Sequence, residues 1–186
     1  MSAIGLAAAH RKSARKVRIY GFPATLIVLL LLTCSRGTGD EKFVLSNGTV
    51  QVSVAPSGGG ITEFRFLDGI VNPLNWEMGR ESVPNDQPYL RGHFLCLDRW
   101  GAPSDAEMEN GMTFHGEAAY VPWRLVSLEG FAESHQEAEM VCDLPIAQLT
   151  VRRVMRLEGN QAVLVVREHI TNTRKLGRIY NIVQHP

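Results

Sequence analysis

Apolar and polar residues alternate along most of the chain after residue 40. In TVQVSV, Val50, Val52 and Val54 fall on one side of the alternation, with polar residues between them. The segments WRLVSLEG, EAEMVCDL and QLTVRRVMRLEG repeat this two-residue period. Such a period is typical of a β-strand with one face buried and the other in water. We therefore predict that these segments are strands.

Two further segments are predicted strands, and turn residues separate the runs. ITEFRFL has the same period, which predicts that Thr62, Phe64 and Phe66 share one face. AVLVVREHITN is apolar on both faces in its first half, as in a strand covered from both sides. Gly, Asn and Asp gather in the breaks SNGT, PSGGG, LDGIVN, LEGNQ and TNTRKLG. LEGNQ lies between two strong strand patterns and predicts a β-hairpin.

The pattern as a whole indicates an all-β sandwich of antiparallel strands, because no long amphipathic helix is predicted after residue 40. The stretch from Asn72 to Gly116 is an exception, since it is rich in Pro, Gly and Asn and alternates little. Loops of this length in compact domains are usually functional or disordered. The aromatic and apolar content favours an ordered loop wall over one sheet face. Its aromatic residues include Trp76, Tyr89, Phe94, Trp100 and Phe114.

The first forty residues have a different character. HRKSARKVR is a basic cluster, and the segment that follows it carries no charge from Ile19 to Ser35. A basic region before a short apolar block is typical of a secretory signal peptide. The run is slightly short for a membrane-spanning helix, which needs about 20 apolar residues. We interpret residues 1–40 as a signal peptide, or an uncleaved apolar anchor helix, with a short linker, and residues 41–186 as an exported domain.

The cysteines bear on localisation. LLTC resembles a bacterial lipoprotein box, although such boxes usually carry Gly, Ala or Ser where Thr33 stands. Cys34 is therefore a candidate lipidation site, with simple cleavage nearby as the alternative. The expected location is the periplasm or cell envelope, where lipidation would anchor the protein to a membrane through its amino terminus. In an oxidising compartment Cys96 and Cys142 could pair, and buried free thiols are the alternative.

Composition narrows the class of partner. The chain has 186 residues, is 45% hydrophobic, and balances 19 Lys and Arg against 19 Asp and Glu. These values are ordinary for a globular protein with one sizeable core. Because the chain has no net charge and no basic stripe, we expect no nucleic-acid partner. An uncharged or weakly polar small molecule fits this balance better.

Two histidines are candidates for a catalytic or binding role. His115 lies in GMTFHGEAAYVPWRL, before a strand predicted near Trp123, and His185 ends the strand pattern RIYNIVQHP. On residue type alone, a histidine bonded to the backbone is the commoner case for both. No HxH, HExxH or CxxC spacing presets two metal ligands, and neither GxSxG nor a phosphate-binding glycine loop occurs. We therefore expect neither a metal nor a cofactor.

Three segments, in order, resemble landmarks of the galactose mutarotase-like family. LRGHFLCLDRWGAPS loosely resembles an Arg-Gly-Gly stretch that leads to a Trp/Phe-Gly-Pro loop, and MTFHGEAAYVPWRL resembles a His-Gly step before a Trp-bearing strand. HITNTRKLGRIYNIVQHP resembles an Asn-Thr strand, a loop and a strand ending in His-Pro. The family includes aldose 1-epimerases and hexose-6-phosphate mutarotases and folds as a β-supersandwich. The resemblance implies that residues 41–186 form the amino-terminal part of such a domain.

The resemblance implies a sugar site on the concave sheet face. His185 would be the general acid that protonates the ring oxygen of the sugar, and His115 would help to hold the sugar. Arg91 and Trp100 fall in the first landmark and are the other substrate-binding candidates. The glutamate that acts as the family's base lies nearer its carboxyl terminus and has no counterpart here. We therefore expect an incomplete supersandwich that does not catalyse efficiently alone.

Two other residues refine these expectations. Glu168 precedes His185 on a predicted strand and does not match the family's base, and we expect it to face solvent. Members that bind phosphate often carry a second arginine after the His-Gly step, whereas this chain has Ala119 nearby. Together with export, this favours an unphosphorylated monosaccharide or glycan as ligand. The expected function is that of an aldose 1-epimerase-like protein, and the alternatives are a non-catalytic carbohydrate-binding envelope lipoprotein or a purely structural envelope domain.

Overall fold

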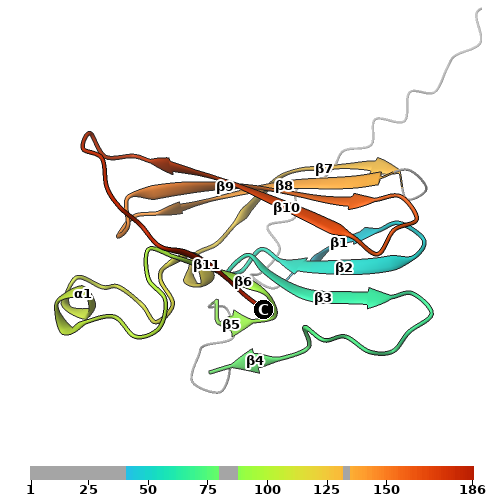
Figure 1. Ribbon diagram of the computed structural model, residues 1–186, viewed down its shortest axis with the longest axis horizontal. Helices are drawn as coiled ribbons and strands as arrows, with labels where there is room; N and C mark the ends of the chain where they lie inside the picture. Colours follow the sequence, from blue (N-terminus) through green and yellow to red (C-terminus); the bar gives the residue numbers. More distant parts are fainter. Residues whose placement is uncertain (1–40, 80–87, 132–134) are drawn as a thin grey trace, which may run out of the picture. The chain divides into compact units, whose positions relative to one another are not determined.

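Almost all regular elements in the described part of the chain are antiparallel β-strands (Figure 1). A computed structural model of the protein describes residues 41–79, 88–131 and 135–186. All of them belong to one unit, which spans Arg36–Pro186. The predicted signal peptide or anchor, including Cys34, lies outside the described residues. Over the three described ranges, no helix has the length and apolar character needed to cross a membrane.

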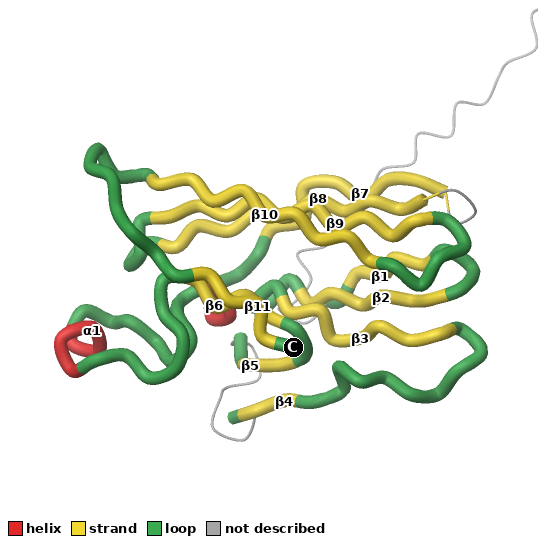
Figure 2. Tube along the Cα trace, in the orientation of Figure 1, coloured by secondary structure: helices red, strands yellow, loops and turns green. Residues whose placement is uncertain are grey.

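Two larger sheets form most of the fold, and Figure 2 shows their strands in yellow. The first sheet has the order β1 (Phe43–Ser46), β2 (Val50–Ala55) and β3 (Gly60–Phe66). The second sheet has the order β10 (Leu164–Asn172), β9 (Leu149–Glu158), β8 (His135–Leu144) and β7 (Arg124–Phe131). Neighbouring strands in both sheets pair antiparallel.

Two short ribbons and two short helical turns complete the described elements. β4 (Glu77–Met78) pairs with β5 (Leu90–Arg91), and β6 (Phe94–Leu97) pairs with β11 (Ile182–His185). The connections contain α1 (Asp105–Glu109) and a 3₁₀ turn, η2 (Ala118–Tyr120). Ser104 caps α1, because its hydroxyl accepts from the Glu107 amide and the Glu107 carboxylate reaches back to the Ser104 amide.

The two larger sheets contribute to a single hydrophobic core. Val50, Val52 and Val54 of β2 are fully buried, as the alternation predicted. Met140 of β8 and Met155 of β9 belong to the same cluster. Burying each such side chain stabilises the fold by roughly 1.5–3 kcal/mol before the entropy cost of ordering the chain. The prediction of an all-β domain of antiparallel strands is confirmed.

Phe64 and Phe66 share one face of β3, as predicted, but the predicted place of Thr62 on that face is interrupted by a register shift. The pairing of β2 with β3 shifts register near Val54, so that Ser53 pairs with Glu63 while Val54 pairs with Ile61. Such a bulge adds one residue to a strand and reverses the alternation beyond it. Thr62 is therefore the extra residue, and Ile61, opposite Val54, faces the core like Phe64, opposite Val52. Phe66 lies opposite Val50 on the same face and is 53% exposed at the end of β3.

The loop predicted over Asn72–Gly116 contains a strand that the pattern missed. β6 has the sequence FLCL, and all four side chains are buried, so it shows no alternation of apolar and polar residues. Its two faces nonetheless differ, because Leu95 and Leu97 belong to the main core. Phe94 and Cys96 belong to a second, smaller cluster that also includes Val183 of β11. The β6–β11 ribbon thus separates the main core from this second cluster.

The remaining local predictions have clear outcomes. LEGNQ is the turn of the hairpin formed by β9 and β10, which confirms that prediction. Cys96 and Cys142 are both buried free thiols, so the disulfide alternative is wrong. Burial raises the pKa of Cys96 to about 11 and that of Cys142 to about 12, which keeps both thiols protonated.

Candidate functional site

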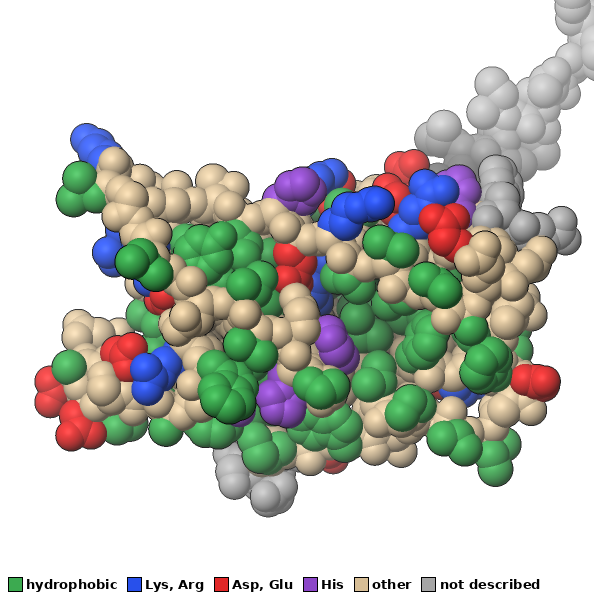
Figure 3. Space-filling view, in the orientation of Figure 1, with side chains coloured by type: hydrophobic (Ala, Val, Ile, Leu, Met, Phe, Trp, Pro, Cys, Tyr) green, Lys and Arg blue, Asp and Glu red, His purple; other side chains and the backbone are tan. Residues whose placement is uncertain are grey.

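His115 and His185 come together on the outer side of the β6–β11 ribbon. Their ring centroids are 5.2 Å apart and the ring planes meet at 74°. The antiparallel register places His185 opposite Phe94, and the two rings stack at 4.7 Å with only 11° between their planes. Trp76 packs against the other rings, at 5.7 Å from His185 and 6.0 Å from Phe94. In the space-filling view, histidine side chains lie among hydrophobic ones near the centre of the face shown (Figure 3).

The backbone at the His-Gly step explains how His115 reaches this cluster. Gly116 has a φ of +82° and forms a parallel bridge with Leu97 of β6. A Cβ atom at Gly116 would overlap the Leu97 carbonyl, so only glycine fits there. His115 has a left-handed φ of 64°, a conformation that costs a non-glycine residue roughly 1–3 kcal/mol. Packing of the buried ring must therefore offset local strain.

Hydrogen bonds fix the tautomer of His115. The backbone N–H of Gly101 donates to His115 Nδ1 at 3.2 Å, and a backbone amide can only donate. Nδ1 therefore has no proton, and in the neutral ring the proton is on Nε2. The Cys96 sulfur lies 3.5 Å from the same Nδ1. Cys96 thus orients the ring and is not a nucleophile, since its thiol stays protonated.

The pKa of His115 lies below its usual value. Burial is the main cause, because the side chain loses the water that would stabilise its charged form, and the charge of His185 adds to the effect. Burial also lowers the pKa of His93, with a second contribution from Arg153. Near neutral pH, His115 is therefore a neutral ring with its proton on Nε2.

We expect the free energy of unfolding to fall as the pH drops below about 6.5, because the unfolded His115 then binds more protons than the folded one. The stabilisation is fully present above that pH and is lost as the pH falls toward the lowered folded-state pKa. Urea unfolding at pH 7.5 and 5.5 measures the difference. His115→Asn keeps an acceptor for Gly101 and tolerates a positive φ, so it should reduce this pH dependence. An unchanged pH dependence in that variant would contradict the account.

Two more aromatic side chains border His115. Phe114 lies edge-on at 4.1 Å between ring centroids, and Trp100 lies at 6.4 Å. Trp100 is 62% exposed, so its indole offers a flat apolar surface to solvent beside the two histidines. The aromatic residues of the Asn72–Gly116 segment were the sequence signal for these contacts around His115.

Arg91, the remaining predicted binding residue, adjoins the cluster through Trp76. Its side chain is buried and lines a cavity of about 280 Å³ together with Trp76 and Glu77. The guanidinium donates to the Tyr89 hydroxyl at 3.1 Å and lies 4.7 Å over the Tyr89 ring. Ring contacts therefore join His115, His185 and Trp100, whereas Arg91 lies at a neighbouring polar cavity.

The prediction that Glu168 faces solvent is wrong. Its side chain is only 6% exposed, because the carboxylate pairs with the buried guanidinium of Arg153, its cross-strand neighbour on β9. Arg153 Nε donates to Glu168 Oε1 at 2.8 Å, and Gln184 Nε2 donates to Oε2 at 2.5 Å. Arg153 and Val151 are two residues apart on β9 and both are buried.

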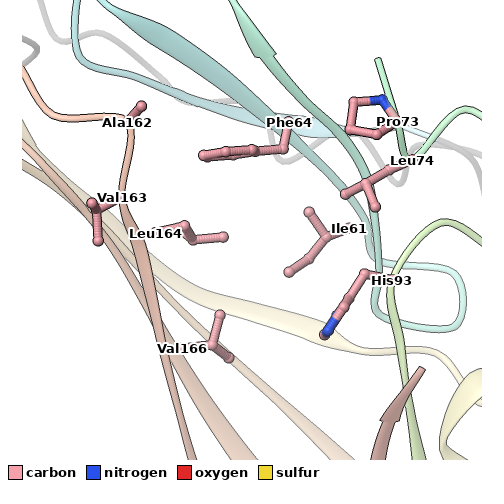
Figure 4. A pocket seen from close by; sticks show the side chains of 9 residues that line it. All are labelled: Ile61, Phe64, Pro73, Leu74, His93, Ala162, Val163, Leu164 and Val166. Atoms are coloured by element: carbon pink, nitrogen blue, oxygen red, sulfur yellow. The ribbon is translucent and has the colours of Figure 1, made fainter. Parts of the chain in front are cut away.

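A second hollow lies between β3 and β10, as Figure 4 shows. It has a volume of about 430 Å³, and Ile61 and Phe64 line it from β3 while Leu164 and Val166 line it from β10. Among the described residues, His93 is its one polar lining side chain, and none of them supplies a hydrogen-bond partner to the buried His93 Nδ1. A sugar carries several hydroxyl groups that would lose their hydrogen bonds here, so this hollow suits a sugar poorly.

Comparison with known proteins gives no relative: the chain matches no family model, no curated protein and no solved structure. The geometry defines an all-β protein with an aromatic-walled site built around two histidines. Within the three described ranges, no three His, Cys, Asp or Glu side chains gather closely enough to hold a metal ion. Sequence patterns did not reveal the contact of Cys96 with His115 or that of Gln184 with Glu168, because both depend on strand pairing between distant segments.

Proposed function

We propose that the two-histidine site binds an unphosphorylated sugar and that His185 acts there as a general acid, as in an aldose 1-epimerase. The supporting observation is the 5.2 Å separation of the His115 and His185 rings within a wall of aromatic side chains. Aromatic faces pack against the apolar faces of sugars, and imidazoles exchange hydrogen bonds and protons with their oxygens. The fold proposed for residues 41–186 is the amino-terminal part of a galactose mutarotase-like β-supersandwich.

In the proposed reaction, the two histidines have different roles. His115, neutral with its proton on Nε2, donates a hydrogen bond to a sugar oxygen. His185 gives a proton to the ring oxygen while a base removes the proton of the anomeric hydroxyl. The bond between the anomeric carbon and the ring oxygen breaks, and an open-chain aldehyde forms. Rotation about the bond next to the aldehyde carbon and reversal of the proton transfers then give the other anomer.

The base of this reaction is proposed to be a carboxylate outside the described residues. Glu168 is unsuited to that role, because Arg153 and Gln184 already occupy its two oxygens. Without such a base, the same site would be a carbohydrate-binding site. The exposed indole of Trp100 favours this second candidate, a non-catalytic carbohydrate-binding envelope lipoprotein, because stacking needs no proton transfer.

The proposal includes export to the periplasm or cell envelope. It is supported by the basic cluster followed by the uncharged segment Ile19–Ser35. Cys34 is proposed as the lipidated amino terminus of the mature protein. The mass of the mature amino-terminal peptide tests this, since a peptide that begins elsewhere or lacks acyl chains would contradict it.

We expect saturation-transfer NMR to show binding of glucose or galactose to the wild-type protein, and weaker binding of glucose 6-phosphate. Trp100→Ala should weaken binding by about 2- to 10-fold, since aromatic packing contributes about 0.5–1.5 kcal/mol. Phe66→Ala is the matched control, because Phe66 is 53% exposed at the end of β3. If no sugar or glycan binds the wild type, the proposed function is wrong in both forms.

A further inference from the structure

Gln184 and His185 point to opposite sides of β11. Side chains alternate along a strand, so His185 and Val183 share one face and Gln184 takes the other. The pairing with β6 agrees, because Val183 packs with Phe94 and Cys96 in the smaller cluster. The side of β11 that carries Gln184 therefore faces the four-stranded sheet, where Glu168 lies. A contact made by Gln184 on that side restrains the backbone of β11, and His185, the next residue, points from that backbone to the other side.

That contact ends a chain of buried polar groups. Gln184 Nε2 donates to Glu168 Oε2 at 2.5 Å, and Arg153 Nε donates to Glu168 Oε1 at 2.8 Å. Arg153 Nη2 also lies 2.7 Å from Oε1, and the two side chains are 1% and 6% exposed. At the far end, Arg153 Nη1 donates to the Gly59 carbonyl at 2.5 Å, and the guanidinium lies 4.3 Å over the Trp123 ring.

The orientation of Gln184 follows from the chemistry of its partner. An ionised carboxylate only accepts hydrogen bonds, so the amide nitrogen of Gln184 has to face Glu168. Arg153 keeps the carboxylate in one place, because separating a buried ion pair would leave an uncompensated charge. Gln184 thus hydrogen-bonds a rigid acceptor, although it is itself exposed.

Few other interactions hold β11. The strand has four residues and pairs with β6 alone among the described strands. Before the strand, Arg178 forms an ion pair with Asp98, and the Asp98 amide donates to the Asn181 carbonyl at 2.8 Å. These contacts fix the amino-terminal end of β11. The contact from Gln184 to Glu168 is the corresponding restraint beside His185.

We propose that Gln184 and Glu168 are positioning residues, which set the rotation of β11 about its axis and thereby hold the His185 ring on Phe94 and beside His115. The inference rests on the proposed function, since it concerns the strand that carries the proposed acid. The proposed role differs from a purely structural one, because loss of the Gln184 contact is expected to move the His185 ring while the fold is retained.

The stacking of His185 on Phe94 provides a spectroscopic test. A ring stacked at 4.7 Å gives the His185 carbon-bound protons upfield ring-current shifts. In Gln184→Ala we expect most of that upfield shift to disappear, while the far-UV circular dichroism stays unchanged. The pKa of His115 should also move back toward 6.5, because the nearby charge of His185 contributes to lowering it.

Two further variants of Gln184 test whether its hydrogen-bond donor, rather than the size of its side chain, holds the His185 ring. Gln184→Lys keeps a donor for the carboxylate and should retain the His185 shift, whereas Gln184→Glu sets two carboxylates together and should lose it. Glu139→Gln is the control, because Glu139 forms an exposed ion pair with Arg152 on the same sheet. The proposal is overturned if the His185 protons keep their shifts in both Gln184→Ala and Gln184→Glu. The NMR result stands whether or not sugar binds, so failure of the proposed function is seen separately.

Discussion

Replacement of His185 by alanine is expected to slow catalysed anomer interconversion by about 10²–10⁴-fold, the usual contribution of a general acid. The ring is half-buried at the end of β11 and lies outside the main core, so the fold should survive its loss. Polarimetry on the protein produced from its complete reading frame measures the rate, with α-glucose and α-galactose as substrates. Two-dimensional exchange NMR gives the same rate at equilibrium.

His169→Ala is the matched control for this experiment. His169 is an exposed histidine on β10, so it tests whether loss of any imidazole lowers the rate. An identical rate in wild type and His185→Ala would overturn the assignment of His185 as the acid. A wild-type rate no faster than buffer, with sugar binding intact, would instead select the non-catalytic binding function.

Arg153→Ala is expected to lower the free energy of unfolding by about 3–5 kcal/mol, because it leaves the Glu168 carboxylate buried without its countercharge. The variant also removes the hydrogen bond to the Gly59 carbonyl and the packing of the guanidinium on Trp123. Urea unfolding followed by tryptophan fluorescence measures the loss. This is the largest destabilisation that we predict for a single substitution in the described residues.

Arg152→Ala provides a close comparison within the same strand. Arg152 pairs with Glu139, but its side chain is 47% exposed, and exposed ion pairs contribute at most about 1 kcal/mol. The double variant Arg153→Met with Glu168→Leu should recover part of the loss, since it removes both charges together. If Arg153→Ala lowers the free energy of unfolding no more than Arg152→Ala does, the buried ion pair does not stabilise the sheet as described.

The elements that could be predicted from the sequence are those governed by local alternation. The two-residue period of β2, β8 and β9 identified strands, and the Gly and Asn of LEGNQ identified the turn between β9 and β10. Both signals act between residues close in the chain, because side chains alternate along any strand and turn residues adopt their conformations locally. Resemblance, rather than periodicity, singled out His115 and His185.

Three features escaped prediction for physical reasons. β6 is buried on both faces, which removes the alternation that marks a strand. The register shift between β2 and β3 makes Thr62 an extra residue, so that Ile61 and Phe64 both face the core although they are three positions apart. Glu168 is buried because Arg153 on the neighbouring strand supplies its countercharge, and such a pairing depends on register rather than on either residue alone.

By itself, the sequence determined that the chain forms antiparallel strands, where many of them lie, and which residue types could carry acid chemistry. The tertiary structure decided which of those residues meet. His115 and His185 are seventy positions apart, and they come within 5.2 Å because β11 pairs with β6 and Gly116 bridges to Leu97. Alternation is a property of each strand, whereas the meeting of two side chains depends on long-range pairing that no local pattern specifies.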